Sequence, residues 1–317
     1  MSKILALTLI FLLSSCSDDA TFSEINGKTM GTTYSVKMVT DTDINVTKIE
    51  IDKRLNEINK VFSNWDPQSE LSLLDSEPAN TWIEVSDELL FVLTESKKIM
   101  QQTDGAFDPG IGRLIDIWGF GPKRVEQKPD RSQIEDMVAL SSLRNLYIEN
   151  NKIKKDIDIH INLSAIAKGY AVDEIAELLR VKGFEDFLVE IGGEVIASGE
   201  NIDQEWTVGI ENPNSQMSIP ITLINQAIAT SGNYRNFFIW EGEKYDHIIE
   251  PSSGLPIRSD LASVSVIHPQ TMMADAYATA MMVMGSERSK ELAEQLNLSV
   301  ILILNEEREF KQIKINL

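Results

Sequence analysis

An acid and an alcohol lie four residues apart near the C-terminal end of the chain. Asp275 and Thr279 fall in a segment, residues 272–284, that is rich in Ala and Met and that we expect to be helical. This spacing places a carboxylate and a hydroxyl on one helix face. Hard oxygen donors of this kind suit Mg²⁺, above all when a substrate phosphate completes the coordination shell. An Asp in an N-terminal turn and a Thr bonded back to the helix backbone also explain the spacing, and by spacing alone this interpretation is favoured.

One of the three histidines is a candidate for proton transfer. His247 opens residues 247–254, a strand-like segment that runs into a turn containing Pro and Gly. Because the imidazole pKa lies near neutrality, a histidine close to a loop can act as an acid or a base. A histidine bonded to the backbone explains this segment equally well. His160 and His268 lie in strand-like runs, and we interpret both as structural.

Glycine-rich segments offer places where a ligand could approach the backbone. Residues 104–112 are rich in turn formers and are followed by Trp118-Gly119-Phe120-Gly121, whose aromatics could face a ring system or fill a core. Residues 191–194 and 229–235 could wrap a phosphate with amides or form tight turns. The chain has no G-x-x-x-x-G-K-[ST] motif, and Gly110-Ile111-Gly112 lacks the third glycine of a dinucleotide fingerprint. Any nucleotide is therefore held in another way.

Together, and in this order, these segments resemble the ApbE family of FAD:protein FMN transferases. The likeness extends from about residue 28 to residue 300. The matching segments are Met30-Gly31-Thr32-Thr33-Tyr34, residues 104–109 with 118–121, residues 162–173, Gly192-Gly193-Glu194, residues 230–235, residues 247–254 and Ala274-Asp275.

The resemblance implies an α+β, T-fold-related fold in two parts, with FAD as substrate in the cleft between them. It implies that Mg²⁺ bridges the FAD pyrophosphate, that FMN passes to a Thr or Ser hydroxyl of an acceptor protein, and that AMP leaves. Asp275 and Thr279 match metal-binding positions, and Ala165 matches one that uses its main-chain oxygen. His247 stands where the family's histidine is thought to help deprotonate the acceptor. The positions that match flavin-nucleotide contacts are Met30, Trp65, Ala106, Phe107, Asp108, Asn162, Lys168 and Ile249.

The chain departs from the family pattern at four positions. Asn162, Asn233 and Glu250 stand where the family usually has Asp, and Ala278 sits where some members have an additional Asp ligand. A metal here would rely on Asp275, Thr279, the main-chain oxygen and the FAD phosphates. Two alternatives stay open: an FAD pyrophosphatase that uses water as the acceptor at the same site and yields FMN and AMP, and a tethered flavin-binding protein without turnover, for which the altered Asn162, Asn233 and Glu250 are the reason. By family analogy alone, the acceptor is a subunit of a membrane redox complex.

The N-terminus is typical of an exported, lipid-anchored protein. Lys3 is followed by a short apolar run, residues 4–13, and by Leu13-Ser14-Ser15-Cys16, which resembles the lipobox of bacterial lipoproteins. We expect a signal peptide over residues 1–15, lipidation of Cys16, a tether over 16–28 and a catalytic domain over 29–317. This predicts the periplasmic side of a bacterial cell envelope, with the inner membrane favoured. A plain signal peptide with an incidental cysteine is the alternative.

Composition limits the other classes of function. The 317 residues carry 29 Lys and Arg against 49 Asp and Glu, a formal charge of −20, which argues against a nucleic-acid partner. The single cysteine rules out an intrachain disulfide, and one Cys with three His is too few for a closed structural zinc site without carboxylates.

The elements that must position these residues follow from hydrophobic periodicity and end signals. We expect five helices. The first has Ile51, Leu55, Ile58 and Phe62 on one face, the second starts at Ser86, and the third follows a Ser132/Glu135 capping box. The fourth covers residues 164–182 and ends at Gly183, and the fifth covers residues 272–284 and ends at Gly285. We expect strands at 32–39, in a hairpin around Asn150-Asn151, and at 186–191, 194–198, 206–210, 218–224, 261–268, 299–304 and 310–315. Strands and helices mix without regular alternation, which favours an α+β fold.

Overall fold

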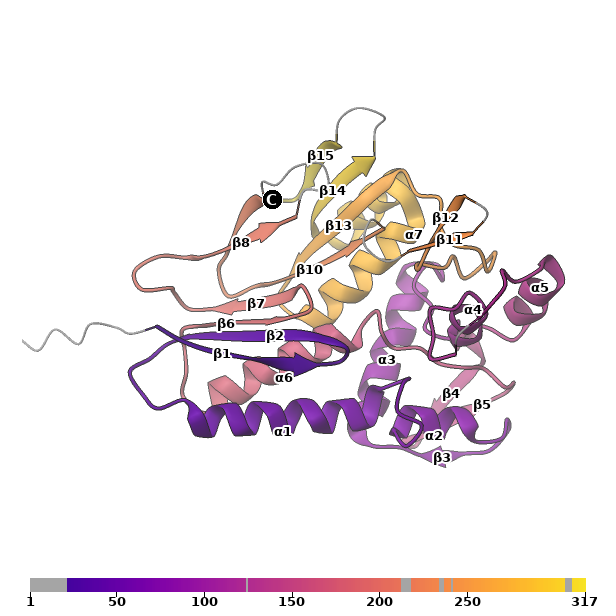
Figure 1. Ribbon diagram of the computed structural model, residues 1–317, viewed down its shortest axis with the longest axis horizontal. Helices are drawn as coiled ribbons and strands as arrows, with labels where there is room; N and C mark the ends of the chain where they lie inside the picture. Colours follow the sequence, from indigo (N-terminus) through magenta and orange to yellow (C-terminus); the bar gives the residue numbers. More distant parts are fainter. Residues whose placement is uncertain (1–21, 124, 212–217, 234–236, 241, 306–309) are drawn as a thin grey trace, which may run out of the picture.

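The computed structural model describes residues 22–123, 125–211, 218–233, 237–240, 242–305 and 310–317 (Figure 1). The predicted signal peptide and Cys16 lie outside the described residues. No helix in the described ranges combines the length and the apolar character that crossing a membrane requires.

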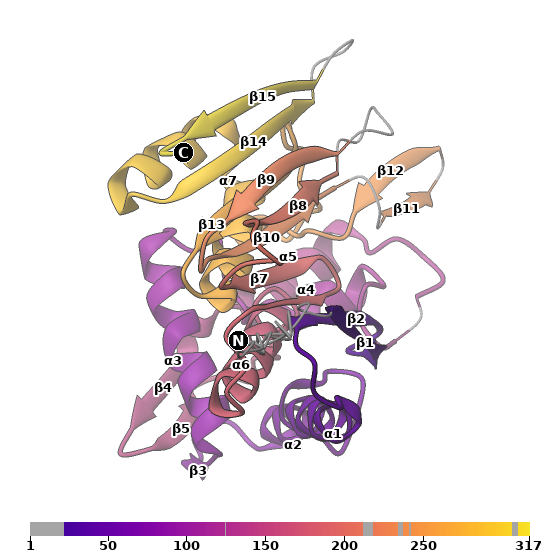
Figure 2. The same ribbon diagram turned by 90° about the vertical axis from the view of Figure 1, so that its left-hand side faces the viewer.

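An eight-stranded antiparallel sheet forms the centre of the molecule. Figure 2 shows it with β15 at the upper edge and β1 at the lower. In spatial order its strands are β1 (Phe22–Thr29), β2 (Thr32–Val39), β6 (Phe187–Ile191), β7 (Glu194–Ser198), β10 (Ala227–Gly232), β13 (Leu261–His268), β14 (Ser299–Asn305) and β15 (Phe310–Ile315).

The tether prediction was wrong for residues 22–28. They belong to β1, which pairs with β2 from Phe22 opposite Val39 to Thr29 opposite Thr32. Ile25 is buried in the core beneath this strand. A polar edge strand of this kind has only one inward apolar side chain at its centre, so its periodicity is too weak to find from the sequence.

Helices cover one face of the sheet. Helices α6 (Ala167–Val181) and α7 (Thr271–Leu296) pack against the central strands, and α1 (Asn45–Phe62) packs against α6. Helices α2 (Glu70–Ser76) and α3 (Asp87–Gln102) extend this layer. The predicted face of α1 is confirmed, since Ile51, Leu55, Ile58 and Phe62 are its buried apolar residues. Ser86 caps α3 as predicted, accepting a hydrogen bond from the Leu89 amide.

A hairpin covers the opposite face of the sheet. Strands β8 (Trp206–Ile210) and β9 (Ile219–Leu223) pack onto inner side chains of β6, β7, β10, β13 and β14, and this forms a second apolar cluster. Both faces of the central strands are thus buried, which explains why every residue of β13 except the last is buried, Ser263 and Ser265 included.

Smaller elements gather at one end of the molecule (Figure 1). They are α4 (Gly112–Ile117), α5 (Arg131–Ala139), η1 (Leu143–Asn145), the sheet of β3 (Ile83–Glu84), β5 (Lys152–Lys155) and β4 (Leu146–Glu149), and the hairpin of β11 (Phe237–Trp240) and β12 (Glu243–Asp246). The Asn150-Asn151 hairpin turn is confirmed, with both residues at positive φ. The Ser132/Glu135 capping box was wrong, because α5 begins at Arg131 and its reciprocal cap joins Asp130 to Gln133.

Two helices differ from their predicted bounds. The turns at residues 164–166 precede α6, so the regular helix begins at Ala167 rather than Ser164. The break at Gly285 is confirmed by its φ of 77° and ψ of 176°, but helical residues continue to Leu296. Asp260 stabilises this restart because its carboxylate accepts a hydrogen bond from the Ser286 amide at 3.0 Å.

Candidate active site

A cavity of about 690 Å³ lies between the sheet with its helices and the end that carries α4 and the β11–β12 hairpin. Its lining includes Gly192 and Thr230 from the sheet side and Ile111 and Pro251 from the other end. The structure brings almost every site residue expected from the sequence into this lining: Met30, Ala106, Phe107, Asp108, Asn162, Ala165, Lys168, His247, Ile249, Asp275 and Thr279.

Trp65 does not line the cavity. It lies in the loop after α1, and 69% of its surface is exposed. Trp118 does not line the cavity either, because it is fully buried and donates a 2.7 Å hydrogen bond from Nε1 to the carbonyl of Gly254. Of the two interpretations of this aromatic, the core one is therefore correct.

The turn between β1 and β2 brings Met30 to the cavity. Met30 and Gly31 have φ values of 49° and 74°, which is the backbone of a tight hairpin turn with two left-handed residues. A methionine rarely adopts such a φ, so the backbone at Met30 is held by the turn that brings it to the cavity.

Asp275 and Thr279 lie one turn apart on α7 and both face the cavity. Asp275 is 4% exposed, and its Oδ2 accepts a hydrogen bond from the Gly169 amide, at the start of α6, at 3.1 Å. Thr279 and Ser231 on β10 share a hydroxyl–hydroxyl hydrogen bond of 2.9 Å. The polar atoms of both residues thus engage neighbouring elements across the cavity wall. The alternative prediction, a Thr bonded back to its own helix, does not describe this contact.

Lys168 lies between two buried carboxylates. Its Nζ is 3.0 Å from Oε1 of Glu194 and 3.7 Å from Oδ2 of Asp275. Burial raises the pKa of Glu194 to about 8, against the attraction of Lys168. Burial also raises the pKa of Asp275. Burial lowers the pKa of Lys168, but the attraction of both carboxylates outweighs it and the net shift is upward, so Lys168 keeps its charge.

The donor atoms around Asp275 fit a hard divalent cation. No three His, Cys, Asp or Glu side chains cluster as a metal site among the residues the structure describes. A Mg²⁺ held by Asp275 and Thr279 would therefore need main-chain and phosphate oxygens as further ligands, which is the usual way proteins hold this ion at phosphates. Oε2 of Glu194 is buried beside them without a hydrogen-bond partner among the described atoms, and it is a further oxygen that a cation would satisfy.

His247 follows the last residue of β12 and lines the cavity. The edge of its ring faces Phe120, with 6.2 Å between the centroids. Phe120 packs on Phe238 of β11 at 4.8 Å, so an aromatic cluster backs the histidine. The position suits a group that exchanges a proton with a substrate in the cavity.

Comparison with known proteins decides the family. The model of the ApbE family matches residues 30–302. This chain belongs to the ApbE family. The FAD:protein FMN transferase of Vibrio cholerae is 37% identical over 98% of this chain and 95% of its own length, and that of Haemophilus influenzae is 35% identical over 98% and 94%.

Solved structures show the same ApbE fold. The flavin transferase ApbE from Vibrio cholerae superposes with a TM-score of 0.88 at 36% identity, covering 93% of this chain and 97% of that one. The apo flavinyl transferase ApbE from Pseudomonas stutzeri gives a TM-score of 0.87 at 32% identity, covering 93% and 95%. The expected α+β fold of the ApbE type is confirmed.

Glu194 and Ser231 are polar residues of this ApbE-family site that were not among the predicted site residues. Glu194 lies in a block that the resemblance quotes, and its signal was a charge at the start of an otherwise apolar strand. Ser231 lies in another such block. Asp108, by contrast, was predicted as a flavin contact, and its Oδ1 accepts hydrogen bonds from the amides of Gly110 and Leu143 at 2.8 and 2.7 Å. This carboxylate holds the loop that forms one wall of the cavity.

Proposed function

We propose that this chain transfers the FMN moiety of FAD to a Thr or Ser hydroxyl of an acceptor protein and releases AMP. The observation that carries the proposal is the convergence of Asp275, Thr279, Lys168 and His247 on one cavity. The names of the ApbE relatives support flavin transfer as the activity.

The residues have distinct parts in this reaction. Lys168 lines the cavity and offers a point charge to a phosphate of FAD. His247 accepts the proton of the acceptor hydroxyl, whose oxygen forms a bond to the phosphorus of the FMN half as the P–O bond to AMP breaks. Asp275 and Thr279, with the main chain of Ala165, would hold Mg²⁺. When bound, this ion supplies positive charge that neutralises the pyrophosphate.

Labelling of an acceptor tests the proposal. The chain is mixed with FAD, Mg²⁺ and a flavin-accepting subunit of a membrane redox complex, and products are separated under denaturing conditions. Transfer gives flavin fluorescence bound covalently to the acceptor and one AMP per label. Free FMN with AMP and no labelled acceptor would show hydrolysis instead. FAD binding without any AMP would show a flavin-binding protein without turnover, and either result overturns the proposal.

We also propose that Cys16 is lipidated and anchors the domain on the periplasmic side of a bacterial membrane, the inner one being favoured. The support is the lipobox-like sequence before this cysteine. Mass spectrometry of the purified mature protein should find an acylated Cys16 as the first residue. A Cys16→Ala variant should leave the membrane fraction, and a variant that stays there would refute the anchor.

A further inference from the structure

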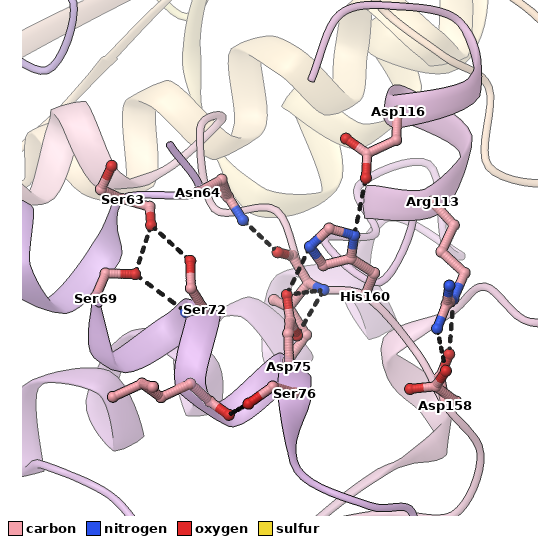
Figure 3. A network of polar contacts seen from close by, with 12 residues as sticks. Ser63, Asn64, Ser69, Ser72, Asp75, Ser76, Arg113, Asp116, Asp158 and His160 are labelled. Carbon is pink, nitrogen blue, oxygen red and sulfur yellow. Dashed lines mark hydrogen bonds and ion pairs between the residues drawn. The ribbon is translucent and has the colours of Figure 1, made fainter. Parts of the chain in front are cut away.

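The segment between β5 and α6, residues 156–166, forms part of the cavity wall. Asn162, Ser164 and Ala165 of this segment line the cavity. The segment has no strand or helix of its own over its second half, so its position depends on contacts with its neighbours. These contacts centre on His160 (Figure 3). From the sequence, this residue could not be distinguished from an ordinary structural histidine.

Both ring nitrogens of His160 face carboxylates. Nε2 lies 2.9 Å from Oδ2 of Asp75 in α2, and Nδ1 lies 3.1 Å from Oδ2 of Asp116 in α4 (Figure 3). A neutral imidazole donates from only one nitrogen, whereas an imidazolium donates from both. The arrangement therefore matches a protonated ring that joins α2 to α4 through the segment between them.

Further hydrogen bonds hold the backbone of His160 and Ile161 in place. The carboxylate of Asp75 also accepts from the Ile161 amide at 3.1 and 3.2 Å, and Asn64 donates to the Ile161 carbonyl at 2.7 Å. The Gly112 amide, at the start of α4, donates to the His160 carbonyl at 2.8 Å. The two loops that supply Asp108 and Asn162 to the cavity thus share one set of contacts.

Close packing leaves these contacts little room to shift. A Cβ on Gly112 would lie 2.7 Å from the His160 carbonyl oxygen, and a Cβ on Gly121 would lie 1.8 Å from Oδ1 of Asp116. Only glycine allows the backbone to approach so closely at these two points. Among the described residues, two cations lie beside this cluster: Arg113 of α4, which pairs with Asp158, and Lys155, whose Nζ donates to the Asp75 carbonyl at 2.7 Å.

We propose that His160 is a positioning residue for the FAD site, which as an imidazolium clamps α2 and α4 and so holds Asn162 and Ala165 in the cavity wall. The inference rests on the proposed function, because it takes FAD to be the ligand of this cavity. It assigns His160 no contact with the reacting atoms.

The electrostatics of the cluster agree with this geometry. The hydrogen bonds to Asp116 and Asp75 raise the pKa of His160 to about 9, although burial opposes them. Burial raises the pKa of Asp75, and its bonds to His160 and the Ile161 amide offset this only in part. The clamp is thus complete at neutral pH, and it weakens as the pH rises through about 9 and His160 loses its proton.

The test compares His160→Gln with His268→Gln, a histidine outside the cavity lining whose ring contacts Gln270. FAD dissociation constants are measured by flavin fluorescence from pH 7 to pH 10, together with kcat at saturating FAD. We expect His160→Gln to weaken FAD binding about tenfold at pH 7, as loss of a supporting partner commonly does, with kcat changed less than the affinity. The wild type should lose affinity as the pH rises through about 9, and His160→Gln should lack that step. The control should follow the wild type.

A second measurement keeps the clamp testable if FAD does not bind. In the ligand-free chain at pH 7, the amides of Gly112, Ile161 and Asn162 should exchange with solvent faster in His160→Gln and in the milder Asp116→Asn than in the wild type. If the wild type does not bind FAD but both variants still exchange these amides faster than the wild type, FAD is refuted as the ligand and the clamp is supported. Wild-type FAD affinity, pH profile and amide protection in His160→Gln would overturn the inference.

Discussion

Lys168, the second residue of α6, and Glu194, the first residue of β7, are joined by an ion pair of 3.0 Å inside the cavity wall. The pair links α6 to β7 at the wall of the predicted flavin site. Because Asp275 also faces Lys168, one cation there serves two buried carboxylates. Burial raises the pKa of both carboxylates, so an added cation beside them would favour their ionised forms.

Removing Lys168 should destabilise the fold, because it leaves both carboxylates buried without a cation. We expect Lys168→Met to lower the free energy of unfolding by about 2 kcal/mol, less than for a fully buried pair because 27% of the side chain is exposed. Urea denaturation measures this. The double variant Lys168→Met/Glu194→Gln should recover part of the loss, since one of the unpaired carboxylates is gone. If the loss in the double variant equals the sum of the losses in the single variants Lys168→Met and Glu194→Gln, the pair has no energetic coupling.

Asp275 should be required for AMP release. We expect Asp275→Ala to lower the rate of Mg²⁺-dependent AMP release from FAD at least about a hundredfold, as loss of a charge-stabilising group at a phosphate does. Chromatography of the nucleotide products measures the rate. Asp136→Ala, at an exposed acid of α5, makes the same change in charge and should behave as the wild type. An unchanged rate in Asp275→Ala would remove the metal role of this residue.

His247 should act on turnover more than on binding. We expect His247→Ala to lower kcat of acceptor labelling by about 10²–10⁴-fold, the usual loss for a general base, while the FAD dissociation constant changes little. Time courses of acceptor labelling give kcat, and fluorescence titration gives the FAD dissociation constant. Added imidazole should restore part of the activity in the variant. A large loss of FAD affinity with unchanged kcat would instead place His247 in binding.

The stability of the ligand-free chain should depend on pH through His160. Its folded pKa of about 9 lies above its ordinary value of 6.5. A group with a raised folded pKa contributes stability that is complete below about 6.5 and is lost as the pH rises through about 9. The difference in unfolding free energy between the wild type and His160→Gln should therefore be largest near pH 6 and shrink by pH 10. A difference that stays constant across this range would show that the pKa of His160 is the same in the folded and unfolded chains, against the raised folded pKa.

Local patterns in the sequence determined the regular elements of the central fold. The four buried positions of α1, the cap at Ser86 and the break at Gly285 each depend on residues within a few turns of one another. The interactions behind these patterns are local: side-chain periodicity, a side-chain hydrogen bond to a nearby amide, or a φ that favours glycine. The same reasoning began α5 two residues too late, because Asp130 and Ser132 are both good capping residues and only the packing of the helix selects one.

The site was foreseen as a set of residues but not as a set of contacts. The resemblance to the ApbE family named Asp275 and Lys168, yet only the folded chain shows that Asp275 binds an amide 106 residues away. Nothing in the sequence near Glu194 or His160 shows which charged groups these residues face. Their importance comes from burial, which raises the pKa of Glu194, and from the hydrogen bonds to Asp116 and Asp75, which raise the pKa of His160. Burial and charge pairing are properties of distant segments brought together, so the sequence settled which groups are present, and the tertiary structure decided which of them act on one another.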